Sequence, residues 1–252
     1  MTKGHNSLLI FSVGLLFAAT AFGKDLSVRY RVTETTDGSP EKQYEVGSYW
    51  AGNLYVSDEE NLRKILDVKK ETITTIEKTE RVYRVGTFQE LREQIKAMQA
   101  AREQQMAELP PDQRALGEAA IAYQREQQMR ARYEPTGRTE TIAGYDAREY
   151  VLDSGPYRLS VWTTEAITPP PNPLTRLLGD VYDAMFVPGR GAAEGADGVN
   201  GLRLRTISES KMAGIKGIST SEAIDVKEQA PPPELLRVPE GYTRSTYDTV
   251  SR

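Results

Sequence analysis

The sequence predicts a mainly β fold, in which an antiparallel sheet carries inserted helices. Apolar and polar residues alternate in short segments such as 28–33, and this period of two indicates strands with one buried face. Only three polar residues separate the β-branched segments 64–68 and 72–76, whereas a parallel crossover needs about a dozen. The period lengthens to about 3.6 after residue 87 and again after residue 173, which indicates helices. We expect about nine strands, one docked helix and one helical hairpin.

Residues 1–23 have the layout of a secretory signal peptide. Lys3 precedes an apolar run over residues 8–22, which ends in the small-x-small site Ala21-Phe22-Gly23. The run is shorter than the roughly 20 residues of a stable transmembrane helix, although a retained N-terminal anchor helix is the alternative. We therefore expect export to the periplasm, a mature chain that begins near Lys24, and no transmembrane anchor after cleavage.

The 252 residues include no cysteine. The exported chain therefore has no disulfide, and it cannot be a lipoprotein acylated at an N-terminal cysteine. With 32 basic and 36 acidic residues the formal net charge is −4, which argues against a nucleic-acid surface. Residues 24–252 have a suitable length for a single β domain with insertions.

Residues 135–152 and 157–162 are predicted to form the central hairpin of the sheet. The second segment alternates between two sets of side chains, which are Tyr157, Leu159 and Val161, and Arg158, Ser160 and Trp162. One set should therefore meet the core and the other should meet water. Gly144 predicts a bend or bulge in the first segment, and Gly155-Pro156 predicts the reversal between the two strands.

Residues 86–132 are predicted to form a helical hairpin between strands. Thr87 and Glu90 have the spacing of a capping box at the start of its first helix. Pro110-Pro111 should end that helix, and a second helix begins near Asp112. The apolar stripe is narrow among many Glu, Gln and Arg residues. The pair is therefore either an edge element half exposed to solvent, or a lid or a surface for a partner.

A further helix is predicted after Asn172-Pro173, because Asn is a good N-cap and Pro suits the first helical position. Its apolar residues recur at helical spacing, at Leu174, Leu177, Leu178, Val181 and Met185. Burial of these five side chains would contribute on the order of 7 to 15 kcal/mol before entropy, so the helix should dock on the sheet. Residues 189–201 are rich in Gly and Ala and predict a flexible loop. Two strands follow near 202–207 and 218–226, and the segment 235–242 is expected to pack back.

The mature sequence lacks the usual groups of catalytic and metal sites. Its only histidine, His5, lies in the signal peptide, and cysteine is absent. Nucleophilic pairs with imidazole, and zinc and haem sites of the usual kinds, therefore have no residues to build them. The loop 194–200 lacks the D-x-D-x-D-G pattern of calcium sites. We expect no enzyme activity, no cofactor and no metal.

Several short segments together resemble the forty-four twelve family of domains of unknown function over most of the mature chain. They are Leu109-Pro-Pro-Asp-Gln-Arg114, Pro135-Thr-Gly-Arg138, Ile142-Ala-Gly-Tyr145, Glu149-Tyr150, Val161-Trp162 and Val238-Pro-Glu-Gly-Tyr242. Many family members carry a cysteine soon after the Gly-Tyr pair, where this chain has Asp146-Ala147. Any role of that thiol is therefore absent.

The family is similar in architecture to the LolA-like carriers of lipoproteins and lipids. The resemblance implies a mainly β (α+β) domain, with a curved antiparallel sheet or incomplete β-barrel, a capping helix and the inserted helical hairpin. It also implies a lipid or another apolar small molecule as ligand. The ligand cavity is expected between the sheet and the capping helix, at Tyr157, Leu159, Val161, Leu174, Leu177, Leu178, Val181 and Met185. The alternative is a structural or adaptor protein of the cell envelope, whose helical hairpin binds a protein partner.

Overall fold

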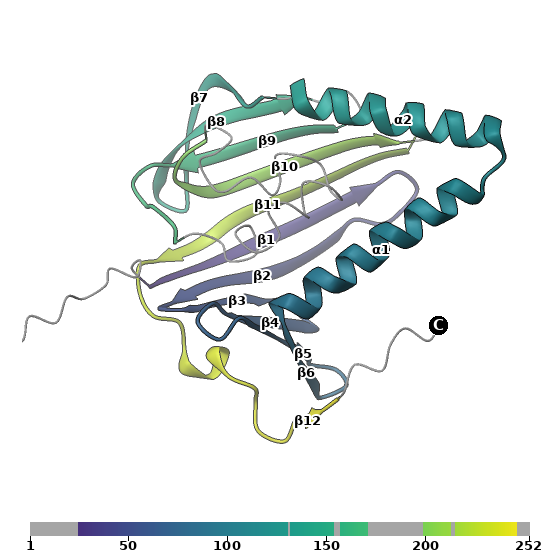
Figure 1. Cartoon of the computed structure of the whole chain (residues 1–252). Coiled ribbons are helices and arrows are strands. Elements are labelled where there is room, and N and C mark those ends of the chain that lie inside the picture. Colours follow the sequence, from purple (N-terminus) through teal and green to yellow (C-terminus); the bar gives the residue numbers. More distant parts are fainter. Residues whose placement is uncertain (1–24, 131, 154–156, 171–198, 213–214, 246–252) are drawn as a thin grey trace, which may run out of the picture.

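A single open, curved sheet of 12 strands forms most of the structure, and it is not closed into a barrel (Figure 1). The computed structural model describes residues 25–130, 132–153, 157–170, 199–212 and 215–245. The strand order is β12-β6-β5-β4-β3-β2-β1-β11-β10-β9-β8-β7. The predicted mainly β class is thus confirmed, although the sheet has more strands than the expected nine.

The chain order of the elements follows the predicted sequence of strands, helical hairpin and strands. The strands before the helices are β1 (Leu26–Thr36), β2 (Lys42–Ala51), β3 (Leu54–Asp58), β4 (Leu62–Asp67), β5 (Thr72–Glu77) and β6 (Val82–Thr87). The helices are α1 (Phe88–Glu108) and α2 (Pro111–Arg130). The remaining elements are β7 (Glu134–Ile142), β8 (Tyr145–Asp153), β9 (Tyr157–Thr164), β10 (Leu202–Met212), β11 (Ile215–Lys227), the 3-10 turn η1 (Pro233–Leu236) and β12 (Thr243–Arg244).

Two meanders meet at the centre of the sheet, where β1 pairs with β11. Their antiparallel register extends from the pair Ser27 and Lys227 to the pair Thr36 and Gly217. Neighbouring strands are antiparallel throughout, except that the short β12 runs parallel to β6 at one edge. The chain therefore returns from its C-terminal half to the strand with which the fold begins.

A two-residue turn separates β7 from β8, which corrects the expectation of a bend or bulge at Gly144. Ala143 and Gly144 both have positive φ angles, of 49° and 85°. Positive φ at both central residues is the geometry of the tight turns that match the twist of antiparallel strands. The predicted central hairpin is therefore a three-stranded unit, and this is one source of the additional strands.

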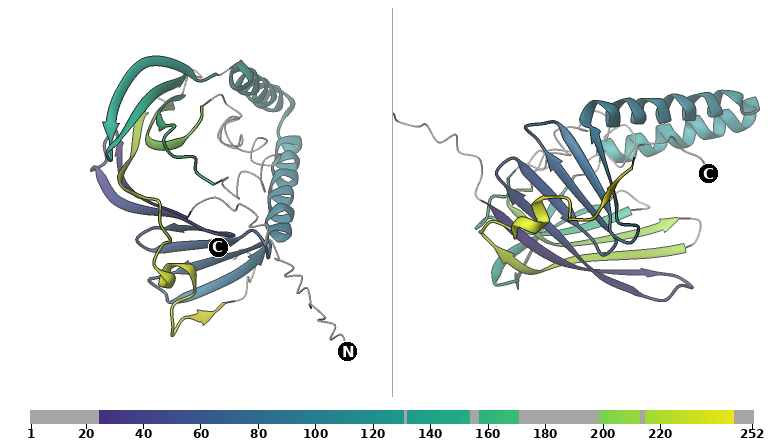
Figure 2. Two further views of the ribbon diagram at one scale, coloured as in Figure 1. Left: turned by 90° about the vertical axis from the view of Figure 1, so that its left-hand side faces the viewer. Right: turned by 90° about the horizontal axis from the view of Figure 1, so that it is seen from below.

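The helical pair lies across the concave side of the sheet (Figure 2). The predicted capping box is present, since the Thr87 hydroxyl accepts from the Glu90 amide at 3.1 Å and the Glu90 carboxylate accepts from the Thr87 amide at 2.7 Å. Phe88 then anchors α1 in a cluster of buried side chains that includes Trp50, Tyr55 and Leu66. We call the sheet face that carries these three residues the inner face, and the opposite face the outer face.

The C-terminal segment covers part of the outer face, as the sequence predicts. Val56, Ile65 and Ile76 are buried there. They pack beneath Leu236, Val238 and Tyr242, with Tyr49, Leu54 and Tyr83 around them. Two of the predicted features, the capping helix that follows Asn172 and the loop 189–201 up to residue 198, lie outside the described residues, as does the signal peptide.

Candidate functional site

The three predicted ligand residues of β9 lie together on the inner face. Leu159 is 8% exposed and Val161 is fully buried, while Tyr157 is half-buried. The cluster around Leu159 and Val161 also contains Leu152, Val199, Tyr133 and Tyr150. The other five predicted residues, Leu174, Leu177, Leu178, Val181 and Met185, lie outside the described residues. The structure thus places these three side chains on one face, and contact with a ligand stays a prediction.

Register connects this part of the inner face to the rest of the sheet, because directly opposed residues of paired strands share a face. Val161 lies opposite Thr206 of β10, and Thr206 lies opposite Ser221 of β11. Ser221 lies opposite Val32 of β1, which in turn faces Tyr44 of β2. The inner face therefore runs from apolar side chains through hydroxyls to apolar side chains again.

The hairpin of β10 and β11 separates hydroxyl groups from charged groups between its two faces. On the inner face we define a hydroxyl strip, which consists of Thr206, Ser208 and Ser210 of β10 and Ser219 and Ser221 of β11. All five side chains are half-buried. The alternate positions on the outer face include Arg205, Glu209, Lys216 and Glu222. The middle of the inner face is thus polar without being charged.

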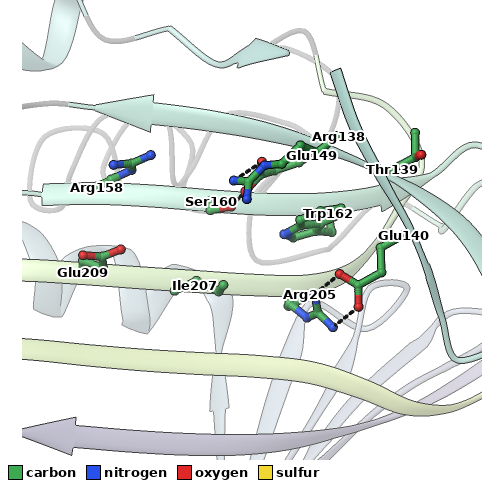
Figure 3. A pocket seen from close by; sticks show the side chains of 10 residues that line it. All are labelled: Arg138, Thr139, Glu140, Glu149, Arg158, Ser160, Trp162, Arg205, Ile207 and Glu209. Atoms are coloured by element: carbon green, nitrogen blue, oxygen red, sulfur yellow. Dashed lines mark hydrogen bonds and ion pairs between the residues drawn. The ribbon is translucent and has the colours of Figure 1, made fainter. Parts of the chain in front are cut away.

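The outer face of β9 is also covered, contrary to the expectation that it meets water. Ser160 is 8% exposed and Trp162 is 6% exposed. The reason is that the C-terminal half of β7 bends over the outer face, so that Thr139 and Glu140 cross in front of the neighbouring strands (Figure 3). The pairing of β7 with β8 is interrupted between Pro135 and Thr139, which permits this bend.

Arg205 of β10 holds the bent part of β7 in place. Its guanidinium donates to both carboxylate oxygens of Glu140, at 2.7 and 2.9 Å (Figure 3). Its Nε also donates to Glu222 at 2.5 Å. These hydrogen bonds raise the pKa of Arg205 further, and the bond from Arg205 lowers the pKa of Glu140. Both partners therefore stay ionised around neutral pH.

Glu149 of β8 forms a second charged cluster under the bend. It is 2% exposed, and its carboxylate accepts from the Ser160 hydroxyl at 2.5 Å and from the Thr136 hydroxyl at 2.7 Å. Arg138 of β7 forms an ion pair with the same carboxylate. Burial alone would raise the pKa of Glu149, but the hydrogen bonds from Ser160, Thr136 and Arg138 outweigh it and hold the pKa below its usual value.

These two clusters border an outer groove of about 610 Å³. Trp162 lies at its centre, with the guanidinium carbons of Arg138 and Arg205 at 5.7 and 5.5 Å from the ring centroid. Such distances allow cation–π attraction. The ring is almost completely covered, so it offers no free face on which a ligand could stack. The ion pairs satisfy the charged groups around it, and we interpret the groove as the anchorage of β7.

Sequence spacing did not reveal these outer residues. Arg138 and Glu149 are on neighbouring strands, but Arg205 is 56 positions beyond Glu149, and the bend of β7 brings Glu140 against Arg205. The β10 half of the hydroxyl strip, by contrast, leaves a signal, because hydroxyl residues alternate with other residues through 206–210. A period of two with Ser or Thr at every second position indicates one uncharged strand face.

No group of three or more acidic, histidine or cysteine side chains in the described ranges could hold a metal ion. Within those ranges, neither helix has the length and apolar character that crossing a membrane requires.

No protein-family profile matches the chain, so the resemblance to the forty-four twelve family stays a prediction. No curated protein sequence matches it either. Among solved structures the chain is similar to PNGF-II, with 13% identity and a TM-score of 0.37, over 90% of this chain and 31% of PNGF-II. A second crystal form of PNGF-II gives a TM-score of 0.36. The chain therefore spans about a third of the length of PNGF-II.

The chain is also similar to the LolA superfamily protein NE2245 from Nitrosomonas europaea. The identity is 11% and the TM-score is 0.32, over 85% of this chain and 90% of NE2245. At these values neither likeness says anything about ligands.

Proposed function

We propose that this chain is an exported periplasmic protein without catalytic activity, and that its inner sheet face binds or carries a lipid or another apolar ligand. The observation that carries the proposal is the absence of charge from the middle of the inner face in the described strands β9, β10 and β11, where Leu159 and Val161 adjoin the hydroxyl strip. The outer positions of β10 and β11 hold Arg205, Glu209, Lys216 and Glu222. An apolar ligand would be desolvated without burying a charge only on the inner face.

The shape of the sheet supports the same interpretation. The sheet curves around its inner face and does not close into a barrel, and α1 and α2 lie across the concave side (Figure 2). Pockets for apolar molecules are concave and mostly apolar, with few polar groups that fix orientation. The inner face of this sheet is concave, and its middle carries apolar and hydroxyl side chains without charge, so it has the features of such a pocket.

The direct test is native mass spectrometry of the mature protein, purified gently from the periplasm of its own cells, followed by lipid extraction. A bound apolar molecule in stoichiometric amount is the expected result, and its mass identifies the ligand. A bare protein mass under conditions that preserve a known carrier complex would contradict the proposal.

A matched pair of variants tests the location. Ser221→Glu places a carboxylate on the inner face, whereas Thr220→Glu places the same charge on the outer face of the same strand. We expect loss of the bound ligand from Ser221→Glu only, because a carboxylate in the site must be desolvated without a partner. Equal ligand content in both variants would exclude the middle of the inner face as the site.

The adaptor alternative is favoured by a different observation, which is the exposure of apolar side chains on the helical pair. Met98 is 62%, Leu116 is 73% and Tyr123 is 63% exposed. Leu116 and Tyr123 are seven residues apart, so they lie on one stripe of α2. An adaptor should lose a partner in a pull-down when both become Gln, while a carrier should keep its bound lipid.

A further inference from the structure

The hydroxyl strip specifies the chemistry of the ligand more closely than the fold does. We propose that the ligand is amphipathic, and that its polar part is uncharged and contains hydroxyl or amide groups that donate and accept hydrogen bonds at the strip. This inference rests on the proposed function, since it names the class of molecule that the inner face would bind. A pure hydrocarbon and an anionic lipid are the two classes that it excludes.

The position of the strip matches such a molecule. On one side Thr206 lies opposite Val161, Ser208 opposite Leu159, and Ser210 opposite Tyr157. On the other side Ser221 lies opposite Val32. A ligand that covers this region would therefore place polar atoms over β10 and β11 and apolar atoms on the flanking strands.

Three of the strip hydroxyls are available for this role. In the part of the chain that the structure describes, no side-chain hydrogen bond involves Thr206, Ser219 or Ser221, and all three are half-buried rather than sealed in the core. A hydroxyl both donates and accepts. A covering ligand without polar groups would leave each hydroxyl without a partner, and such a loss costs free energy.

The strip also lacks a group that would attract an anion. Arg205 and Lys216 of the same hairpin are on the outer face. Arg203 of β10 lies beyond the strip, opposite Thr163, and its guanidinium carbon is 5.9 Å from the ring centroid of Tyr133. Beyond the strip Glu34 lies opposite Ser219, and its carboxylate accepts the Tyr44 hydroxyl at 3.0 Å. The register partner of Glu34 on β2 is Lys42, so that end carries one charge of each sign. A phosphate or carboxylate over the strip would be desolvated without a compensating charge.

The simpler interpretation is that Ser and Thr mark an ordinary solvent-facing side of the sheet. The outer face of the same two strands shows what such a side looks like in this protein, because it carries the exposed side chains of Glu209 and Lys216. Residues exposed only to water are as often charged as hydroxylic. Five hydroxyls in register, without a charge among them, favour a face that is covered by an uncharged polar surface.

The test compares three probes with the same acyl chain, which are 1-monooleoylglycerol, methyl oleate and oleate. Binding to the full mature protein is measured by displacement of a fluorescent apolar dye below the aggregation concentration of each probe. We expect monooleoylglycerol to bind about tenfold more tightly than either other probe, as two added hydrogen bonds imply. Preference for oleate, or equal affinity for all three probes, would overturn the inference and leave the proposed function standing.

Variants locate the preference. The double variant Ser219→Ala and Ser221→Ala should bind the three probes with similar affinity, whereas Thr220→Ala on the outer face should keep the preference. Ser221→Thr retains the hydroxyl and should behave like the parent protein. A preference that persists in the double variant would show that other groups create it and overturn the assignment to the strip. Failure of every probe to bind would instead contradict the proposed function itself.

Discussion

Glu140 of β7 and Arg205 of β10 form a double hydrogen bond at 2.7 and 2.9 Å, although β8 and β9 lie between their strands in the order of the sheet. This ion pair fixes an edge strand on the outer face. It explains why Trp162 is buried on a side of β9 that should otherwise meet water.

Replacing Arg205 by Met should loosen the bent part of β7. The variant leaves Glu140 and Glu222 without their shared partner, and we expect the free energy of unfolding to fall by about 1 to 3 kcal/mol. Trp162 fluorescence should move towards the spectrum of a solvent-exposed ring. Arg158→Met is the matched control, because Arg158 is exposed on the same face and should change stability by less than about 0.5 kcal/mol. Equal effects of both variants would contradict an anchoring role.

Glu149 should make stability dependent on acid pH. Its folded-state pKa is lowered from the ordinary value of 4.5, so the folded state binds the proton less readily than the unfolded state. The ionised Glu149 therefore adds to the free energy of unfolding. This added stability is complete above pH 4.5 and is lost as the pH falls through the lower pKa of the folded state. Urea unfolding between pH 3 and 7 measures it. Glu149→Gln should flatten this dependence, and an unchanged slope would contradict the assignment.

Two glycines should respond to alanine in opposite ways. A Cβ on Gly201 would lie 2.0 Å from the carbonyl oxygen of Thr164, and its φ is +88°, so Gly201→Ala should be strongly destabilising. A Cβ on Gly117 of α2 would lie 2.9 Å from the flexible end of Met106, which can move. Gly117→Ala should therefore stabilise the protein by up to about 1 kcal/mol through helix propensity. Thermal unfolding of both variants checks the contrast.

The cover of the outer face by the C-terminal segment can be tested at its centre. Ile76 is 1% exposed and packs in the cluster that includes Leu236 and Val238. Ile76→Ala should lower the free energy of unfolding by about 2 to 5 kcal/mol, measured by urea denaturation. Val68→Ala is the control, because Val68 is 37% exposed. If the two substitutions cost the same, the segment does not bury the cluster in solution.

Local signals explain which parts of this fold were predictable. The capping box at Thr87, the break at Pro110 and the common face of residues 157, 159 and 161 each depend on neighbours within a few residues, and each of these agrees with the structure. The bend of β7 depends on contacts between residues such as Glu140 and Arg205, which are 65 positions apart. A contact between residues so far apart leaves no periodic pattern in the sequence. The prediction that Ser160 and Trp162 meet water was therefore wrong.

The candidate site was likewise predictable only where it depends on residues close together in the sequence. Alternation placed Tyr157, Leu159 and Val161 on one face, because a strand fixes the direction of successive side chains. It did not show which strand would lie beside them, since β10 follows β9 only after an interval of 37 residues, from 165 to 201. The hydroxyl strip becomes a feature of the site only when register sets Thr206 against Val161.

The pairing of β1 with β11 has a consequence for the order of events during synthesis. The hydroxyl of Ser27 donates to the carbonyl of Gln229, 202 positions away. The central ladder therefore cannot form until nearly all of the chain has left the ribosome, and contacts of such long range are slow to form. Until then β1 has no partner on its β11 side. If the chain is exported, as we propose, that delay keeps the fold incomplete while a secretion channel threads the chain.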